Sequence, residues 1–179
     1  MGGRRHKVSC WDVGCQVELD RLLAWCQVVH GVDQLLVVSR PETDGRRYTF
    51  DPDVARVVKS LFRSSILSTV NAQAWPGSRL FGHSAKVYRV ALNESVAKRM
   101  IASENLVANW THARRPPLPE DICLLRAGDR FPVFISVTHE GDAWLLSDRG
   151  AEFEGAKPCD ATLDDLCVPQ GETFIQPTT

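Results

Sequence analysis

Four potential zinc ligands lie near the start of the chain: Cys10, Cys15, Cys26 and His30. Cys26 and His30 are four residues apart, which places them one turn apart on the same side of a helix. Three thiolates and one imidazole form a donor set that can hold Zn²⁺ in a closed tetrahedral site. The alternative is that the cysteines are core residues, because Cys26 also falls on an apolar stripe and buried cysteine packs as a small hydrophobic residue.

Three histidines fall at the edges of the expected helices and strands, where catalytic groups are often displayed. They are His83, His112 and His139, and the second is followed closely by Arg114 and Arg115. A histidine beside arginine and an acidic partner could act as a general base on a phosphorylated or nucleotide-like substrate. The chain has no Gly-x-Ser-x-Gly elbow, phosphate-binding glycine loop or His-Glu-x-x-His motif. The spacing therefore selects no catalytic set, and ordinary surface or hydrogen-bonded histidines are the simpler interpretation.

Basic residues on two expected helices could form a phosphate-contacting stripe if the helices pack side by side. Residues 1–118 carry a net charge of +7 and residues 119–179 a net charge of −8, so a basic face is conceivable. The sequence pI of about 6.5 argues against a dedicated nucleic-acid-binding protein. Solvated helix faces are the alternative for these residues, which are Arg56, Lys59, Arg63, Lys98 and Arg99.

The second half of the chain offers candidate contacts for a protein partner. Phe134 and Trp144 lie on neighbouring expected strands, where aromatic side chains could anchor a partner if one face of the sheet is uncovered. Asp142 and Asp148 lie in acidic turns that could face a basic partner or bind a divalent metal. Hairpin turns also need Gly-Asp pairs for backbone reasons alone, and this second explanation is the simpler one.

The hydrophobic pattern predicts three amphipathic helices and a set of short strands. Helices are expected at residues 17–30, at 51–66 with an apolar stripe that could continue to Val70, and at 94–109. Strands are expected as a hairpin over 34–50, a single strand at 84–92 and a three-stranded meander over 122–147. A proline-rich joint at 114–119 separates the third helix from the meander.

These elements predict an α+β fold with a mostly antiparallel sheet of about five to six strands and three amphipathic helices. The sheet would combine the N-terminal hairpin, the middle strand and the C-terminal meander. Residues 1–150 are expected to form a single domain, and residues 151–179 an acidic, turn-rich C-terminal tail.

Composition narrows the class of protein. The chain is 44% hydrophobic and 24% charged, which is typical of a globular protein. No apolar run approaches the roughly 20 residues of a membrane-spanning helix, and no export signal is recognised, so we expect a cytoplasmic protein that contacts no membrane. The six cysteines are expected to be reduced thiols. No cofactor is expected to be required, and zinc is the one cofactor that the cysteines suggest.

The absence of catalytic signatures, the bipolar charge and the aromatic residues of the meander favour a small, non-enzymatic protein-binding module. Such a module could be an inhibitor, a regulator or an immunity-type protein. One alternative is an enzyme with a histidine and arginine pocket for a phosphorylated or nucleotide-like substrate. A second alternative is a nucleic-acid-binding protein.

Overall fold

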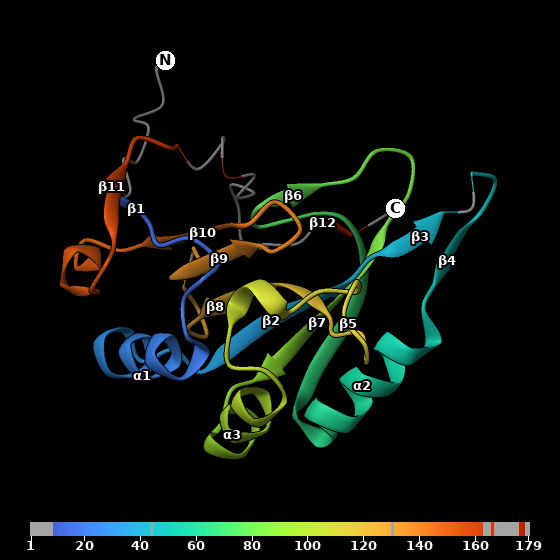
Figure 1. Ribbon diagram of the computed structural model, residues 1–179, viewed down its shortest axis with the longest axis horizontal. Helices are drawn as coiled ribbons and strands as arrows, with labels where there is room; N and C mark the ends of the chain where they lie inside the picture. The colour runs from blue at the N-terminus through green and yellow to red at the C-terminus, as the bar shows by residue number, and fades with distance from the viewer. Residues whose placement is uncertain (1–8, 44, 130, 163–165, 167–175, 178–179) are drawn as a thin grey trace.

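The computed structural model describes residues 9–43, 45–129, 131–162, 166 and 176–177. Its centre is an antiparallel sheet of ten strands, with three helices on one face (Figure 1). Nine strands follow the order β11-β1-β10-β9-β8-β2-β7-β5-β12, and β6 pairs with β5. The sheet strands are β1 (Cys10–Asp12), β2 (Gln34–Ser39), β5 (Ile66–Trp75), β6 (Ser78–Arg79), β7 (Ala85–Ala91), β8 (Glu120–Leu125), β9 (Phe134–Val137), β10 (Asp142–Leu146), β11 (Lys157–Cys159) and β12 (Gln176–Pro177).

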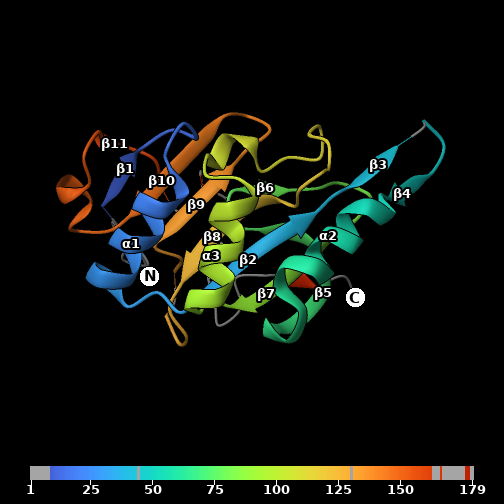
Figure 2. The same cartoon turned by 60° about the horizontal axis from the view of Figure 1, so that its bottom comes forward.

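Three helices lie side by side on this face, in front of the sheet in Figure 2. They are α1 (Leu19–His30), α2 (Pro52–Phe62) and α3 (Glu94–Ser103), and short 3₁₀ turns lie at Arg63–Ser65, Val107–Asn109 and Gly150–Glu152. Asp51 caps α2 by accepting a hydrogen bond from the amide of Asp53, and Asn93 caps α3 in the same way from Val96. The three expected helices are therefore present, although α2 and α3 end earlier than the pattern predicts.

Each face of the sheet buries its own apolar cluster. Leu35 and Val37 of β2 point toward the helices, whereas Leu36 and Val38 point toward the opposite face. All four side chains are fully buried, which is why β2 reads as a continuous apolar run rather than an alternating one. The sheet therefore separates two cores.

The turn between β5 and β6 folds over the second face of the sheet. Gly77 lies so close to β9 that an added Cβ would be 2.8 Å from Val137 and 2.9 Å from Ile135. Its φ of 91° also lies in the region that favours glycine, as expected after proline in a tight turn. Only glycine therefore fits at this position, where β6 and the end of β5 cover the centre of the sheet.

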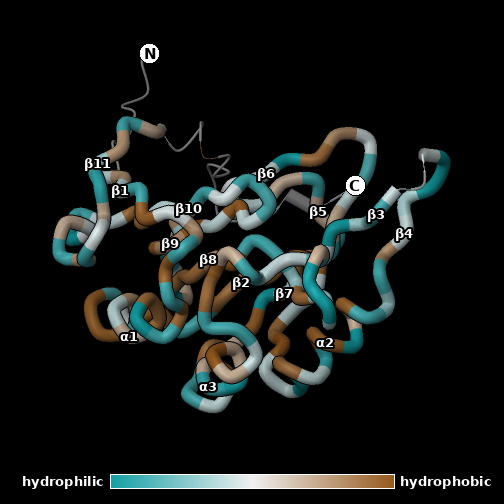
Figure 3. Tube along the Cα trace, in the orientation of Figure 1, coloured by the Kyte–Doolittle hydropathy of each residue, from teal (hydrophilic) through white to brown (hydrophobic). Residues whose placement is uncertain are grey.

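The expected sheet of five to six strands is wrong. The predicted hairpin over 34–50 is split, because β2 pairs with β7 and β8 in the centre of the sheet. The hairpin is formed instead by β3 (Pro41–Thr43) and β4 (Tyr48–Phe50), which pair only with each other in the part of the chain that is described. This two-stranded arm, residues 41–43 and 45–50, is polar along most of its trace and projects beyond the sheet (Figures 1 and 3).

The predicted extension of the second helix toward Val70 is also wrong. Arg63 ends α2 with a φ of 35°, and the chain then enters β5, the longest strand. Val70 and Ala72 of this strand pack on the second face of the sheet. The apolar residues at 66 and 70 fit both a helical and a strand spacing, so the pattern alone could not separate the two.

Residues 151–179 contribute to both edges of the sheet. β11 pairs with β1 at one edge, and β12 pairs with β5 at the other. Leu166 lies between these two strands in sequence and packs in the core of the second face. The acidic C-terminal segment therefore takes part in the fold at these three places.

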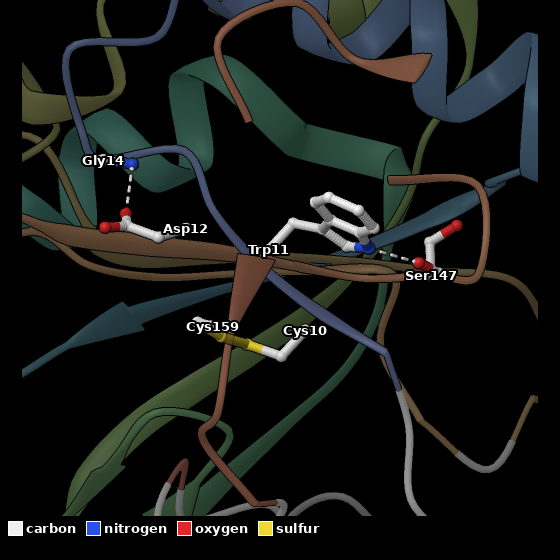
Figure 4. The surroundings of a disulfide bond; sticks show 6 residues. All are labelled: Cys10, Trp11, Asp12, Gly14, Ser147 and Cys159. Atoms are coloured by element: carbon white, nitrogen blue, oxygen red, sulfur yellow. Dashed lines mark hydrogen bonds between the residues drawn. A yellow bond between two sulfur atoms is a disulfide. The ribbon is translucent and has the colours of Figure 1, made fainter. Parts of the chain in front are cut away.

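A disulfide joins Cys10 of β1 to Cys159 of β11 (Figure 4). The two residues are directly opposite each other on paired strands, with a Cα separation of 5.2 Å. The expectation that all cysteines are reduced is therefore wrong for this pair. The remaining described cysteines, Cys15, Cys26 and Cys123, are free and buried.

In the described residues, no helix is long and apolar enough to cross a membrane.

The disulfide closes a loop that spans most of the chain, with a sequence separation of 149 residues. Substituting Cys159→Ser should lower the free energy of unfolding by about 2–5 kcal/mol, because the unfolded chain regains the entropy of the open loop. Urea unfolding with and without reductant measures this effect. Reductant should lower the midpoint of the wild-type protein and leave the variant unchanged, and an equal midpoint for both proteins without reductant would contradict the assignment.

Candidate functional site

Four ionisable side chains converge where β2 ends, β8 begins and β9 ends. Arg40 follows β2, Glu120 and Asp121 open β8, and His139 lies two residues after β9. We call these four residues the Arg40 cluster. The register of the three neighbouring antiparallel strands brings them to the same end of the sheet.

A β-bulge in the β2–β8 ladder lies at Asp121. Between two pairs of the β2–β8 ladder, β8 has two residues where β2 has one. Asp121 is one of the two, and its φ of 52° lies in the left-handed region that aspartate tolerates better than most residues. The side chain of Asp121 faces the second core, on the same side of β8 as Cys123 and Leu125, where it meets Trp75.

The carboxylate of Asp121 is fully buried and accepts hydrogen bonds at both oxygens. The bonds to Oδ2 come from Arg40 Nη2 at 2.6 Å, Trp75 Nε1 at 3.0 Å and Ser78 Oγ at 3.4 Å, and the bond to Oδ1 comes from the amide of Thr138 at 3.2 Å. Burial alone would raise the pKa of Asp121, but the interactions with His139, Arg40 and Trp75 outweigh it and lower the pKa below its ordinary value. The carboxylate is therefore held in its charged form.

Glu120 is the second buried carboxylate of the cluster. Its Oε1 accepts hydrogen bonds from the hydroxyl of Thr111 and the amide of His112, each at 3.2 Å. Its Oε2 lies 3.4 Å from Nε of Arg40. The same guanidinium therefore faces both carboxylates, and it also lies over the ring of Trp75 at 5.1 Å.

His139 is the exposed member of the cluster, with 37% of its side chain accessible. Its Nδ1 lies 3.9 Å from Oδ1 of Asp121, and its Nε2 lies 3.3 Å from Nη1 of Arg40 and 3.5 Å from Glu140. The Asp121 carboxylate raises the pKa of His139. Ligand atoms of Glu120, Asp121 and His139 all lie within 4.8 Å of one another, so the three could hold a metal ion, the one such group among the described residues.

The four residues predicted as zinc ligands are used separately. Cys10 is in the disulfide, Cys15 donates to the carbonyl of Asp142 at 2.9 Å, and Cys26 is buried against other apolar residues. Burial, with nearby carboxylates, raises the pKa of Cys15 to about 12. Nε2 of His30 is hydrogen-bonded to the hydroxyl of Ser147 at 2.9 Å. The structure therefore does not bring these four together as a metal site, because Cys10 has no thiolate to offer.

The predicted histidine and arginine set is also dispersed. Among the three histidines, only His139 is paired with an arginine and a carboxylate. His112 is buried and contacts Glu120 through its backbone, while His83 stacks on Tyr48. Two arginines make local bonds instead, with Arg114 paired to Glu104 at 2.7 Å and Arg115 donating to the carbonyls of His112 and Arg114.

The predicted basic stripe is partly neutralised within its own helices. Arg56 pairs with Asp53, Lys98 pairs with Glu94, and Arg99 donates to the carbonyl of Leu61 and the hydroxyl of Ser95. Lys59 and Arg63 are exposed at the end of α2.

The predicted partner contacts on the meander lie on different sides of the sheet. Phe134 is fully buried under the helices, and Trp144 is partly buried against the second core. Asp142 and Asp148 are exposed, and Asp148 accepts a hydrogen bond from Ser9. A buried Phe134 is not accessible to a partner, so these four residues do not form one surface.

The exposed aromatic residues lie elsewhere, at the arm and the loop before β7. Tyr48 is 52% exposed and Phe81 is 81% exposed. Tyr48 stacks on His83 with ring centroids 4.0 Å apart and planes inclined by 10°. The sequence does not reveal this site, because its pattern predicts that residues 46–50 lie within the main sheet, where Tyr48 would be covered.

Comparisons with known proteins give no family for this chain. No protein family, curated protein or solved structure matches it.

The substitution Asp121→Ala should destabilise the protein by about 3–5 kcal/mol, because it leaves the indole of Trp75 without its acceptor and removes one of the two carboxylates that the partly buried guanidinium of Arg40 faces. Thermal and urea unfolding at neutral pH measure the loss. Asp142→Ala, an exposed aspartate near the same end of the sheet, is the control and should change stability by less than about 0.5 kcal/mol. Equal effects of the two substitutions would refute the role given to Asp121.

Proposed function

We propose that this chain is a small, non-enzymatic protein-binding module that contacts its partner through Tyr48, Phe81 and His83, here called the arm surface. The observation that supports the proposal most directly is the exposure of Phe81 beside the stacked rings of Tyr48 and His83. Large aromatic side chains are the commonest anchors of protein interfaces. Tyr48 and Phe81 are two of four large hydrophobic side chains that are exposed in the described residues.

The arm surface is held in place before a partner arrives. Stacking of His83 on Tyr48 joins the loop before β7 to the arm, and the carbonyl of Phe81 contacts Nδ1 of His83 at 3.0 Å. At the base of the arm, Lys86 lies 4.6 Å from the ring of Phe50. Ordered aromatic groups lose little conformational entropy on binding, which favours affinity.

The charge around the arm surface favours an acidic partner. Residues 41–50 and 78–86, which carry the three side chains, contain four Lys or Arg and two acidic residues. A partner with carboxylates around an apolar pocket would complement this surface in charge and shape. A nucleic acid would also be attracted by the basic residues, and the test below distinguishes it from a protein partner.

The compartment in which the protein acts is part of the proposal. The cytoplasm remains a prediction, and the disulfide between Cys10 and Cys159 weighs against it. Disulfides persist mainly in oxidising compartments. We therefore expect the protein to act in an oxidising compartment, where the disulfide between Cys10 and Cys159 persists.

Residues kept exposed for binding should contribute little to folding. The double substitution Tyr48→Ser and Phe81→Ser should leave the free energy of unfolding within about 1 kcal/mol of wild type, because neither side chain belongs to the core. Urea unfolding of the wild-type protein and of the variant measures this free energy. A larger loss would assign the two aromatics to the fold rather than to a partner.

The partner itself can be tested with a photo-reactive side chain placed at Phe81 and, as a control, at Val28, which is 85% exposed on α1. Crosslinking in an extract of the source cells, with and without nuclease treatment, should yield one protein at Phe81 and not at Val28. That protein, once purified, should bind the Tyr48→Ser, Phe81→Ser variant at least about 30-fold more weakly than wild type. Equal crosslinking at both positions, unchanged affinity of the variant, or a crosslink to nucleic acid that nuclease abolishes would overturn the proposal.

A further inference from the structure

The Arg40 cluster has more buried negative charge than its one guanidinium balances. Glu120 and Asp121 are both buried, and in the described part of the chain Arg40 is the only lysine or arginine paired with either of them. Buried charges are costly unless they are paired. When His139 is neutral, with its Nε2 accepting from Arg40, the cluster therefore has room, electrostatically, for one more positive charge.

We propose that Glu120, Asp121 and His139 bind one divalent transition-metal ion, for which Zn²⁺ is the best match. Two carboxylate oxygens and an imidazole nitrogen are ligands that Zn²⁺ accepts, leaving a fourth position open to water. The three ligand atoms already lie within 4.8 Å of one another. Two ligands of a tetrahedral zinc ion are about 3.4 Å apart, so Oδ1 of Asp121 and Nδ1 of His139, now 3.9 Å apart, need only a small approach.

The ion can reach the cluster from the side of His139, which is the exposed member. Arg40 binds the other oxygen of Asp121, Oδ2, and so leaves Oδ1 facing the imidazole. The guanidinium also lies 3.4 Å from Oε2 of Glu120, so it competes with the ion for that oxygen, and it lies close enough to repel the ion.

Binding of the ion changes the partner of the imidazole. In the structure, Nη1 of Arg40 lies 3.3 Å from Nε2 of His139, and a guanidinium can only donate, so Nε2 accepts and Nδ1 carries the proton. A metal ion on Nδ1 requires the proton on Nε2 instead. Nε2 then loses Arg40 and can donate to Glu140, whose carboxylate is 3.5 Å away. A carboxylate that accepts from the outer nitrogen of a metal-bound histidine is a common support for such sites.

The site also links the ion to the arm, because Arg40 directly precedes β3. A metal ion that weakens the contact of Arg40 with His139 acts on the residue at the base of the arm. The metal site does not rest on the proposed function, and each can fail without the other.

Titration of the purified, disulfide-bonded protein with Zn²⁺ tests the site, with calorimetry for stoichiometry and tryptophan fluorescence for location. Trp75 donates to Asp121, so its emission should change on binding and the change should be lost in Trp75→Phe. Co²⁺ in place of Zn²⁺ should give absorption bands without thiolate charge transfer, which excludes the cysteines as ligands. We expect one ion per chain.

Variants with matched controls show which side chains bind the ion. His139→Ala should weaken binding at least about 100-fold, and Glu140→Ala about tenfold, whereas Arg40→Gln should tighten it several-fold. His83→Ala, which removes a histidine outside the cluster, should leave the affinity unchanged. Thermal unfolding confirms that each variant is folded, and Glu140, which is exposed, can be replaced without loss of packing. No saturable binding to wild type, equal losses in the His139 and His83 variants, or weaker binding by Arg40→Gln would overturn the proposal.

Discussion

The ion pair between Arg40 and Asp121 is the constraint on which this end of the molecule depends. Asp121 is fully buried, and it is acceptable there because Arg40, Trp75 and Ser78 donate to it. The same bonds hold the end of β5 and the start of β6 over the second core. Buried ion pairs often contribute little net stability compared with apolar side chains, so the value of this one lies in fixing where several strands meet.

The helices could be predicted because their signals are local. Asp51 with Pro52, and Asn93, mark helix starts within a few residues. The sheet could not be predicted to the same extent, because its order depends on partners far apart in sequence. Cys10 and Cys159 illustrate this, since nothing near either residue shows that β1 and β11 pair. β2 was recognised as a strand, but its two neighbours, β7 and β8, follow only from the complete fold.

The candidate sites were hidden for two different physical reasons. His139 is a predicted functional histidine, but its partners Arg40 and Asp121 carry no motif, and no glycine marks the bulge at Asp121. Tyr48 was assigned to a strand of the main sheet, and its exposure follows from the separate arm. Arg40 connects the two sites, because its backbone leads into the arm and its side chain lies among the metal-binding candidates. The proposed protein-binding arm and the proposed metal site are therefore connected through this one residue.

A double-mutant cycle between Arg40→Gln and Asp121→Asn, followed by urea unfolding in the presence of a chelator, tests the central ion pair most directly. The chelator keeps metal from replacing the lost charge. If the pair fixes this end of the sheet, the double substitution should lower the free energy of unfolding by about 2 kcal/mol less than the sum of the two single substitutions. Effects that add to within about 0.5 kcal/mol would show that the two residues act independently and would contradict the account.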